Sequence, residues 1–302
     1  MATARTAHSL LTRRIHPLFM ISPPGRVPDI PDGWEIGPPD FVGVGAAKAG
    51  TTWWWSVMLA HPDISGGRTP DGGFASGADI RPMMDEIYRK KEFHFFDHYG
   101  HVASVEPALY HRYFPRRPGT LTGEWTPRYM YDFWTPPMLS KMAPHAKILV
   151  MLRDPLERLT SAIAHAMNVI HKPVLEYCEA ARDENMISFL EQQVGRGLYW
   201  HQMQALLSYF DRKEILVLQY EQCKLDFAAQ ARRSFAFLGL DPDKWMLPAN
   251  GSQPVGLVSG AKPVLGELTS DAIRQSYKPD LHRLLTEFPE IDGSLWPTAE
   301  VS

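Results

Sequence analysis

Short apolar runs alternate along the chain with segments whose apolar positions recur at helical spacing. Runs at 40–44, 147–152 and 214–219 have the length and apolar character of strands buried on both faces. Helical patterns are expected at about 51–60, 104–118 (stopping before the prolines at its end), 155–170, 186–194, 199–210, 226–238 and 270–286. Strands that alternate with helices predict an α/β fold: one domain with a central parallel sheet flanked by helices.

Other segments carry weaker patterns. Residues 91–96 alternate polar and apolar at their start, which predicts a short strand with Glu92 and His94 on one face. Residues 65–82 are rich in glycine, proline and aspartate and predict a loop, and 123–127 predicts a turn. Residues 1–39 are proline-rich without sustained periodicity, so we expect an N-terminal arm followed by a single domain over 40–302.

Composition narrows the classes of function. The 302 residues are 44% hydrophobic and 22% charged, as in ordinary globular proteins. A net charge of −3 argues against a nucleic-acid partner, so an anionic ligand needs local basic groups. Apolar runs fall short of the roughly 18 residues that a membrane-spanning helix needs. Two cysteines, Cys178 and Cys223, are expected to be free thiols, and the expected location is the cytoplasm.

The stretch from Gly45 to Gly50 joins a predicted strand to a predicted helix and consists mostly of small residues. Small residues let backbone N–H groups approach an anion, and a helix N-terminus adds partial positive charge. Lys48 contributes a full charge, and Thr51 and Thr52 contribute hydroxyl donors. This combination predicts a phosphate-binding loop rather than a plain strand-to-helix turn.

Two common phosphate-binding patterns fit this loop poorly. Gly45 and Gly50 have the glycine spacing of G-x-x-x-x-G-K-[ST], but Thr51 occupies the position of the lysine that contacts β- and γ-phosphates. The dinucleotide pattern G-x-G-x-x-G fails because Lys48 replaces its third glycine. A kinase of the P-loop type and an NAD-linked oxidoreductase are therefore weaker hypotheses.

A second anion site is predicted where the strand 147–152 ends. Arg153 follows this strand directly, at the edge where α/β sheets bind ligands, and Ser161 lies eight residues further on. An arginine fork and a hydroxyl suit a phosphate monoester. Asp154 is expected to cap the next helix, with Pro155 in its first position. Arg158 is expected to be an exposed charge on that helix.

Four stretches together resemble the sulfotransferases that use 3′-phosphoadenosine 5′-phosphosulfate (PAPS), in particular bacterial relatives of the heparan-sulfate type. The family's P-K-[SA]-G-T-T loop is similar to 47–52, with Ala47 in place of proline, and its 3′-phosphate motif to 152–161. Its K-E-x-H-F-F signature is similar to 91–96 and G-E-K-[ST]-P-x-Y to 123–129. The resemblance extends over about 40–290 and implies a P-loop-kinase-like nucleotide-binding core.

The resemblance also implies roles for individual residues. Lys48 and its loop would bind the 5′-phosphate and help the bridging oxygen to leave, and Glu92 would be the base, with His94 as its support or the alternative base. Lys91 would contact donor or acceptor. The further expected donor-binding residues are Ala49, Gly50, Thr51, Thr52, Arg153, Ser161, Tyr199 and Lys262.

The expected activity is therefore in-line sulfuryl transfer from PAPS to a hydroxyl, or less readily an amine, with no metal required. Trp125 stands where glycosaminoglycan enzymes usually have lysine, which favours Trp125 as a contact to an apolar, aromatic or sugar-face acceptor. The expected acceptor is a small molecule such as a lipid, glycolipid or secondary metabolite. The remaining alternatives are a P-loop-type kinase and a non-catalytic nucleotide-binding module, which would have no use for Glu92 beside His94.

Overall fold

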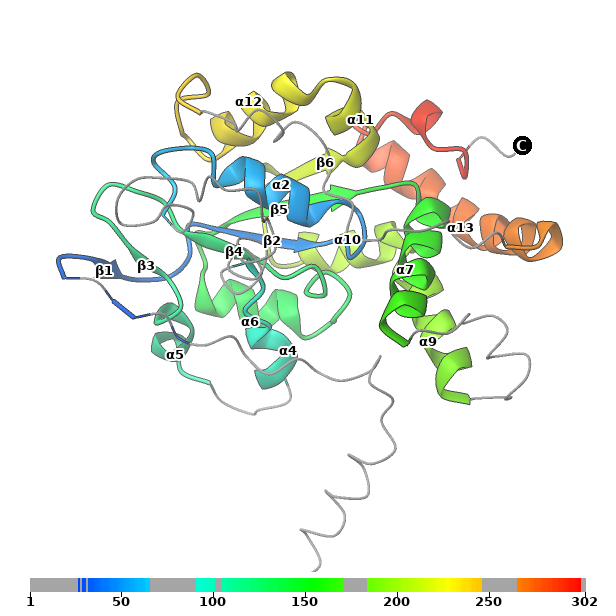
Figure 1. Cartoon of the computed structure of the whole chain (residues 1–302), viewed down its shortest axis with the longest axis horizontal. Coiled ribbons are helices and arrows are strands. Elements are labelled where there is room, and N and C mark those ends of the chain that lie inside the picture. The colour runs from blue at the N-terminus through cyan, green and yellow to red at the C-terminus, as the bar shows by residue number, and fades with distance from the viewer. Residues whose placement is uncertain are drawn as a thin grey trace, which may run out of the picture.

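A four-stranded parallel sheet forms the centre of the protein, as the apolar runs predict (Figure 1). The computed structural model describes residues 27, 29–30, 32–65, 91–100, 105–170, 184–245 and 265–299. The strand order is β4-β2-β5-β6, and every neighbouring pair is parallel. The strands are β2 (Phe41–Gly45), β4 (Gly123–Trp125), β5 (Lys147–Leu152) and β6 (Ile215–Gln219).

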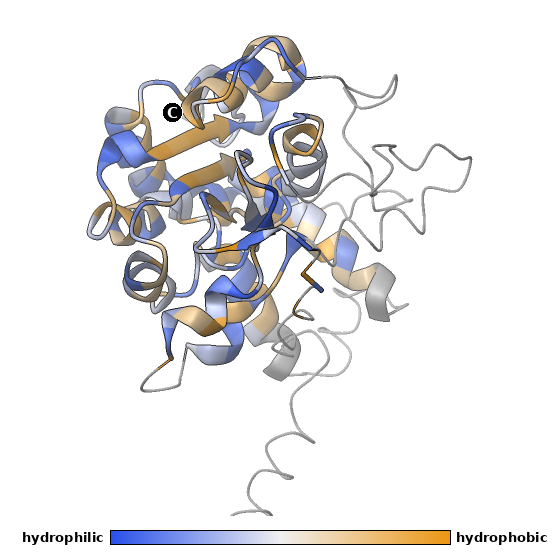
Figure 2. Cartoon of the chain, turned by 90° about the vertical axis from the view of Figure 1, so that its left-hand side faces the viewer, coloured by the Kyte–Doolittle hydropathy of each residue, from blue (hydrophilic) through white to orange (hydrophobic). Residues whose placement is uncertain are grey.

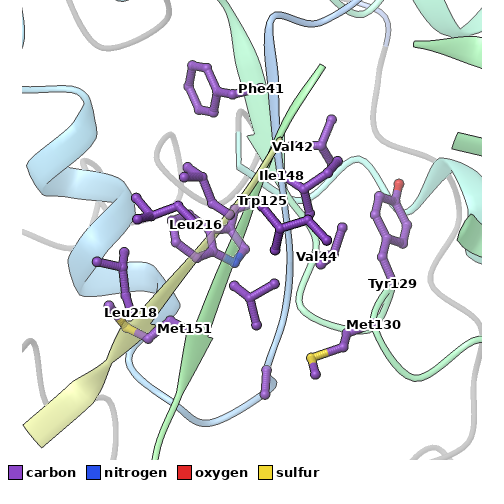
Figure 3. Close-up of a cluster of buried hydrophobic side chains, with 14 of the residues drawn as sticks. Phe41, Val42, Val44, Trp125, Tyr129, Met130, Ile148, Met151, Leu216 and Leu218 are labelled. Carbon is purple, nitrogen blue, oxygen red and sulfur yellow. The ribbon is translucent and has the colours of Figure 1, made fainter. Parts of the chain in front are cut away.

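The strands are almost wholly buried, which explains their uninterrupted apolar character. All residues of β2, β4 and β6 are buried, as are all of β5 after Lys147. In Figure 2 the central strands include orange arrows, the colour of hydrophobic residues, and the helices around them carry both orange and blue stretches. Figure 3 shows buried side chains of the four strands, and the register of the strands places Trp125 and Leu216 on the opposite face of the sheet from Val42 and Ile148.

Helices flank this sheet, and those at 95–99, 135–142 and 220–225 are not among the helices that the sequence predicts. In Figure 1, α2 lies next to α12, with which it is in contact, while α10 packs along α13 and α7 contacts both α9 and α13. The helices are α2 (Thr51–Met58), α4 (Phe95–Tyr99), α5 (Pro107–His111), α6 (Thr135–Met142), α7 (Pro155–Ile170), α9 (Glu184–Gly195), α10 (Tyr199–Leu207), α11 (Tyr220–Leu225), α12 (Phe227–Phe237) and α13 (Glu267–Glu287).

The strand predicted at 91–96 is wrong. Residues 92–94 are irregular and α4 begins at Phe95, because His94 has a left-handed backbone (φ 52°) that ends any extended conformation. Phe93, Phe95 and Phe96 are nevertheless all buried. The apolar pattern therefore reflects packing of a turn and a short helix into the core.

Two other local predictions need correction. The turn expected at 123–127 begins as strand β4, which pairs with β2 at the edge of the sheet. The helix expected over 104–118 is reduced to α5, and Pro115–Arg116 form the short strand β3. The segment 123–127 is too short for its periodicity to separate a strand from a turn.

The end of the predicted N-terminal arm is joined to the domain. Strand β1 (Glu35–Ile36) pairs antiparallel with β3, and Arg116 forms an ion pair with Asp40. The remainder of the arm before residue 27, the predicted loop from 66 onward and Cys178 lie outside the described residues. Cys223 is buried and is not in a disulfide. Among the described helices, none combines the length and apolar character needed to cross a membrane.

Candidate active site

The predicted phosphate-binding loop connects β2 to α2, at the carboxyl end of the parallel sheet. Ala46 N–H donates to the carbonyl of Met151 over 2.7 Å, which ties the loop to the end of β5. Gly50 has φ 93°, and a Cβ there would come within 2.6 Å of the Tyr220 ring. A glycine is needed at this position for both reasons.

Lys48 lies inside this loop with a left-handed backbone (φ 69°). Burial lowers the pKa of Lys48 to about 8, with the charge of Glu92 opposing this shift and that of Lys91 adding to it. The charge of Lys48 in turn lowers the pKa of His165 on α7, after the larger effect of burial. The loop, the Lys91–Glu92 segment and α7 therefore meet around one cationic side chain.

Lys91 connects the loop to the predicted base. The side chain of Lys91 is fully buried, and its Nζ donates to Thr51 Oγ1 over 3.3 Å and forms an ion pair with Glu92. Burial would raise the pKa of Glu92, but the charge of Lys91 and hydrogen bonds from His94 and Lys91 lower it to about 2. Glu92 is thus a carboxylate at neutral pH, with a side chain that is 22% exposed.

Glu92 and His94 are brought together although the strand predicted to align them is absent. His94 Nε2 lies 3.3 Å from Glu92 Oε2, and His94 Nδ1 lies 2.7 Å from Asp97 Oδ2. Burial would lower the pKa of His94, but the hydrogen bonds to Asp97 and Glu92 raise it to about 9. The imidazole is therefore a cation at neutral pH that holds one carboxylate on each ring nitrogen.

Asp97 and Arg128 were not predicted as site residues. Asp97 is buried in the first turn of α4, and Arg128 Nε lies 3.9 Å from Asp97 and 2.8 Å from Asp132. The spacing of His94 and Asp97 across three residues was the available signal for Asp97, since such a pair shares a face at a helix start. Arg128 had no comparable signal because its contact with Asp97 depends on the tertiary fold.

The second predicted anion site adjoins the loop. Arg153 follows β5, and its guanidinium lies 4.8 Å from the centroid of the Tyr220 ring, the same ring that faces Gly50. Arg153 also pairs with Glu157 over 3.0 Å, while its buried Nε has no hydrogen-bond partner among the described residues. A buried donor without a partner fits a site for an anion. Ser161 is half-buried two turns into α7.

Two nearby residues have roles that differ from the expected ones. Arg158 is fully buried rather than exposed, and its Nη1 lies within hydrogen-bond distance of Gln193 Oε1, so it joins α7 to α9. Tyr199 is also fully buried, and its hydroxyl donates to the carbonyl of Arg153 over 2.8 Å. Tyr199 therefore holds the backbone at Arg153. Lys262 lies outside the described residues.

Trp125 is a buried core residue, whereas the sequence analysis expected it to contact the acceptor. The side chain is fully buried, and its indole N–H donates to the carbonyl of Gly45 over 3.2 Å. A Cβ at Gly43 would lie 2.1 Å from the Trp125 ring, so the ring packs directly on β2. Trp125 therefore supports the loop at its first residue, Gly45.

Within the described ranges, no three His, Cys, Asp or Glu side chains gather in a way that could hold a metal ion.

Comparisons with known proteins show the family to which the chain belongs. The model of the sulfotransferase domain family matches residues 38–247. Mouse heparan sulfate glucosamine 3-O-sulfotransferase 3B1 is 27% identical over 207 residues, 67% of this chain and 46% of that protein. A membrane-associated sulfotransferase from Dictyostelium discoideum is 28% identical over 144 residues, 46% of this chain and 26% of that protein. The chain thus spans about half the length of the mouse protein and about a quarter of the Dictyostelium protein.

A solved structure shares the fold. The crystal structure of a sulfotransferase from Alicyclobacillus acidocaldarius aligns with a TM-score of 0.59 at 22% identity, covering 86% of this chain and 99% of that one. The family model covers more than half of this chain, including the loop, Glu92, His94 and Arg153. The chain therefore belongs to the sulfotransferase family.

Proposed function

We propose that this enzyme transfers the sulfuryl group of PAPS to a hydroxyl, with Glu92 as the base. The observation that carries the proposal is the continuous set of contacts from the phosphate-type loop to a carboxylate. Thr51 contacts Lys91, Lys91 pairs with Glu92, and the charge of Glu92 acts on Lys48. A donor held at the loop would therefore present its transferable group beside Glu92.

The donor would be held at both phosphates. The loop N–H groups and Lys48 suit the 5′-phosphate, and Arg153 with Ser161 suits the 3′-phosphate. Two observations support this fit. Arg153 Nε is buried and has no hydrogen-bond partner in the described part of the chain, and the Tyr220 ring neighbours both Arg153 and Gly50. When bound, PAPS supplies the sulfuryl group and a bisphosphate that can depart. Lys48 would stabilise the negative charge that develops on the departing phosphate oxygen.

Of the two possible bases, Glu92 is the better supported. His94 has a pKa raised to about 9 and a carboxylate near each ring nitrogen, so at neutral pH it has no lone pair for a proton. In the step, the acceptor oxygen bonds to sulfur, the bond from sulfur to the phosphate oxygen breaks, and the acceptor proton passes to Glu92. A hydroxyl becomes strongly acidic as its bond to sulfur forms, so a weakly basic carboxylate suffices.

The acceptor is proposed to be a small hydroxyl-bearing molecule such as a lipid, glycolipid or secondary metabolite. Trp125 no longer supports this class, because it is buried. Phe133 does: its side chain is 79% exposed and packs against Trp134, whose indole N–H donates to the carbonyl of Phe96. Through Trp134 this exposed aromatic ring is connected to α4, the helix that follows His94, and it offers a contact to an apolar or sugar face.

Replacing Glu92 by glutamine tests the proposed base. The variant should lose about a hundredfold or more in kcat, since the amide cannot take the proton, while donor affinity stays within about threefold. The measurements are release of 3′-phosphoadenosine 5′-phosphate (PAP) from PAPS with a panel of alcohols and glycosides, and calorimetric titration with PAP. The matched control is Glu287→Gln, at an exposed site on α13. Unchanged turnover in Glu92→Gln would refute the assignment.

A further inference from the structure

The segment that carries Glu92 and His94 lacks a strand or helix to bind its backbone. Its N–H groups are taken by side chains that come from 30 residues further along the chain. Phe93 N–H donates to Glu124 Oε2 over 3.3 Å, and His94 N–H donates to Thr126 Oγ1 over 3.3 Å. Buried N–H groups need such partners, so the two side chains replace the neighbouring strand that the segment does not have.

The next two N–H groups belong to the first turn of α4, where a helix has no internal acceptors. Phe95 N–H donates to the Tyr129 hydroxyl over 2.8 Å, and Phe96 N–H approaches the same oxygen at 3.5 Å. His94, the residue before this helix, provides no side-chain cap. Tyr129 therefore acts as the cap of α4 from outside the helix.

The three acceptors are joined to one another through the Glu124 carboxylate. Oε2 accepts the Thr126 hydroxyl over 2.7 Å, and Oε1 accepts the hydroxyls of Tyr129 over 3.2 Å and Tyr110 over 2.6 Å. All four side chains are completely buried, and Glu124, Thr126 and Tyr129 lie on the strand and turn that follow Gly123. A carboxylate suits this place because it accepts from every direction and offers no competing donor.

Burying the Glu124 carboxylate costs desolvation free energy, which indicates that its hydrogen bonds have a structural role. Burial raises the pKa of Glu124 to about 7, although the hydrogen bonds from Tyr110, Thr126, Phe93 and Tyr129 oppose the shift. An apolar residue of the same size would avoid the cost of desolvation. It would also leave the N–H of Phe93 without an acceptor in the core.

We propose that Glu124, Thr126 and Tyr129 are positioning residues for the proposed catalytic pair Glu92 and His94. They bind the backbone on both sides of His94 and so keep its left-handed conformation, which residues with a side chain seldom adopt. That conformation directs the imidazole to Glu92 on one side and Asp97 on the other. The role in catalysis rests on the proposed function, whereas the positioning itself does not.

Titration of the His94 imidazole tests the positioning directly. The groups that face it are Glu92 and Asp97, with Arg128 next to Asp97, and the two carboxylates hold the imidazolium. Thr126→Val keeps the shape of the side chain but removes the acceptor of His94 N–H. We expect the His94 titration midpoint to fall from about 9 toward 6.5, and Thr126→Ser to restore it. NMR of protein with ¹³C-labelled histidine measures it, with His94→Gln identifying the resonance.

Tyr110→Phe is the matched control. It removes a hydrogen bond to the same carboxylate, but the Tyr110 hydroxyl contacts no backbone of the catalytic segment. The His94 midpoint should stay where it is in the unmodified protein. A midpoint unchanged in Thr126→Val, or lowered equally in Tyr110→Phe, would overturn the proposal. Tyr129→Phe serves as the second test if Thr126→Val does not fold, with the same expected fall and the same contradicting result.

The same proteins separate this proposal from the proposed function. The titration of His94 needs neither donor nor acceptor, so a lowered midpoint supports the positioning role whether or not PAP binds. Failure of PAP to bind would overturn only the choice of donor. If PAP binds, Thr126→Val should keep its PAP affinity and lose kcat about tenfold, as expected when a base loses its alignment. Loss of PAP affinity without a change in the His94 midpoint would contradict the positioning role.

Discussion

Lys48 combines an unusual backbone, burial and charge in one residue. The left-handed conformation places a charged side chain inside a loop of small residues instead of at the helix start. Burial lowers the pKa of Lys48 to about 8, close enough to neutrality for pH to change its charge. An anion bound at the loop would gain most of its charge-assisted stabilisation from this one ammonium group.

PAP affinity should consequently depend on pH. Lys48 is charged below a pH of about 8 and loses its proton as the pH rises through that value, so affinity should be steady below 8 and fall above it. Lys48→Ala should weaken binding by about 1.5–3 kcal/mol, or roughly ten- to a hundredfold, and remove this alkaline decline. Calorimetry between pH 6.5 and 9.5 measures both effects. Lys213→Ala, at an exposed lysine, is the control. A decline that persists in Lys48→Ala would assign it to another group.

Trp125 illustrates where single-residue inference failed. The sequence correctly singles out position 125 as a departure from the related motif, but it does not reveal on which side of β4 the indole lies. The register of β4 against β2 places Trp125 opposite Gly43, whose missing Cβ makes room for the ring. The role of Trp125 thus depends on its pairing with Gly43, 82 residues earlier in the chain, and this pairing forms only in the folded sheet.

At the scale of elements, the unit of β5 and α7 was predictable and the Lys91–Phe96 segment was not. A six-residue apolar run, an aspartate and a proline specify where β5 ends and α7 begins, because each acts through its own neighbours. The segment 91–96 depends on acceptors at 124–129 for its backbone, so its local pattern is a weak guide to its conformation. The sequence nevertheless predicted that Glu92 and His94 lie together, and their side chains are 3.3 Å apart in the structure.

Asp154 offers a test of the β5–α7 junction. Its carboxylate caps α7 by accepting from Leu156 N–H and Glu157 N–H, and it also accepts from the N–H and hydroxyl of Thr298. Asp154→Ala removes a cap and leaves buried donors unpaired, so we expect a loss of about 2–4 kcal/mol in the free energy of unfolding. Urea denaturation measures it.

Asp226 is the matched comparison for that experiment. It caps α12 by accepting from Ala229 N–H but is exposed, so Asp226→Ala should cost only about 1 kcal/mol. Equal losses in the two variants would mean that the buried contacts of Asp154 with Thr298 add nothing to stability.

At the scale of the whole molecule, the strand order brings the two phosphate-type motifs together. β2 and β5 are parallel neighbours, so the loop after β2 and Arg153 after β5 emerge at the same edge of the sheet (Figure 1). The sequence predicts each strand and each motif separately, together with the α/β class. The order β4-β2-β5-β6 comes from contacts between residues that are far apart in the sequence, such as Phe41 with Lys147 and Ile148 with Ile215, which no local pattern contains.

The central claim is that these two motifs form one site for a nucleotide with 5′- and 3′-phosphates. Calorimetric titration of the full chain with PAP, and in parallel with ATP and NAD, tests it most directly. The account predicts that PAP binds at least tenfold more tightly than either of the others, the difference that about 1.4 kcal/mol from the 3′-phosphate contacts would give. Absence of PAP binding, or tighter binding of ATP, would contradict the account and favour a kinase of the P-loop type.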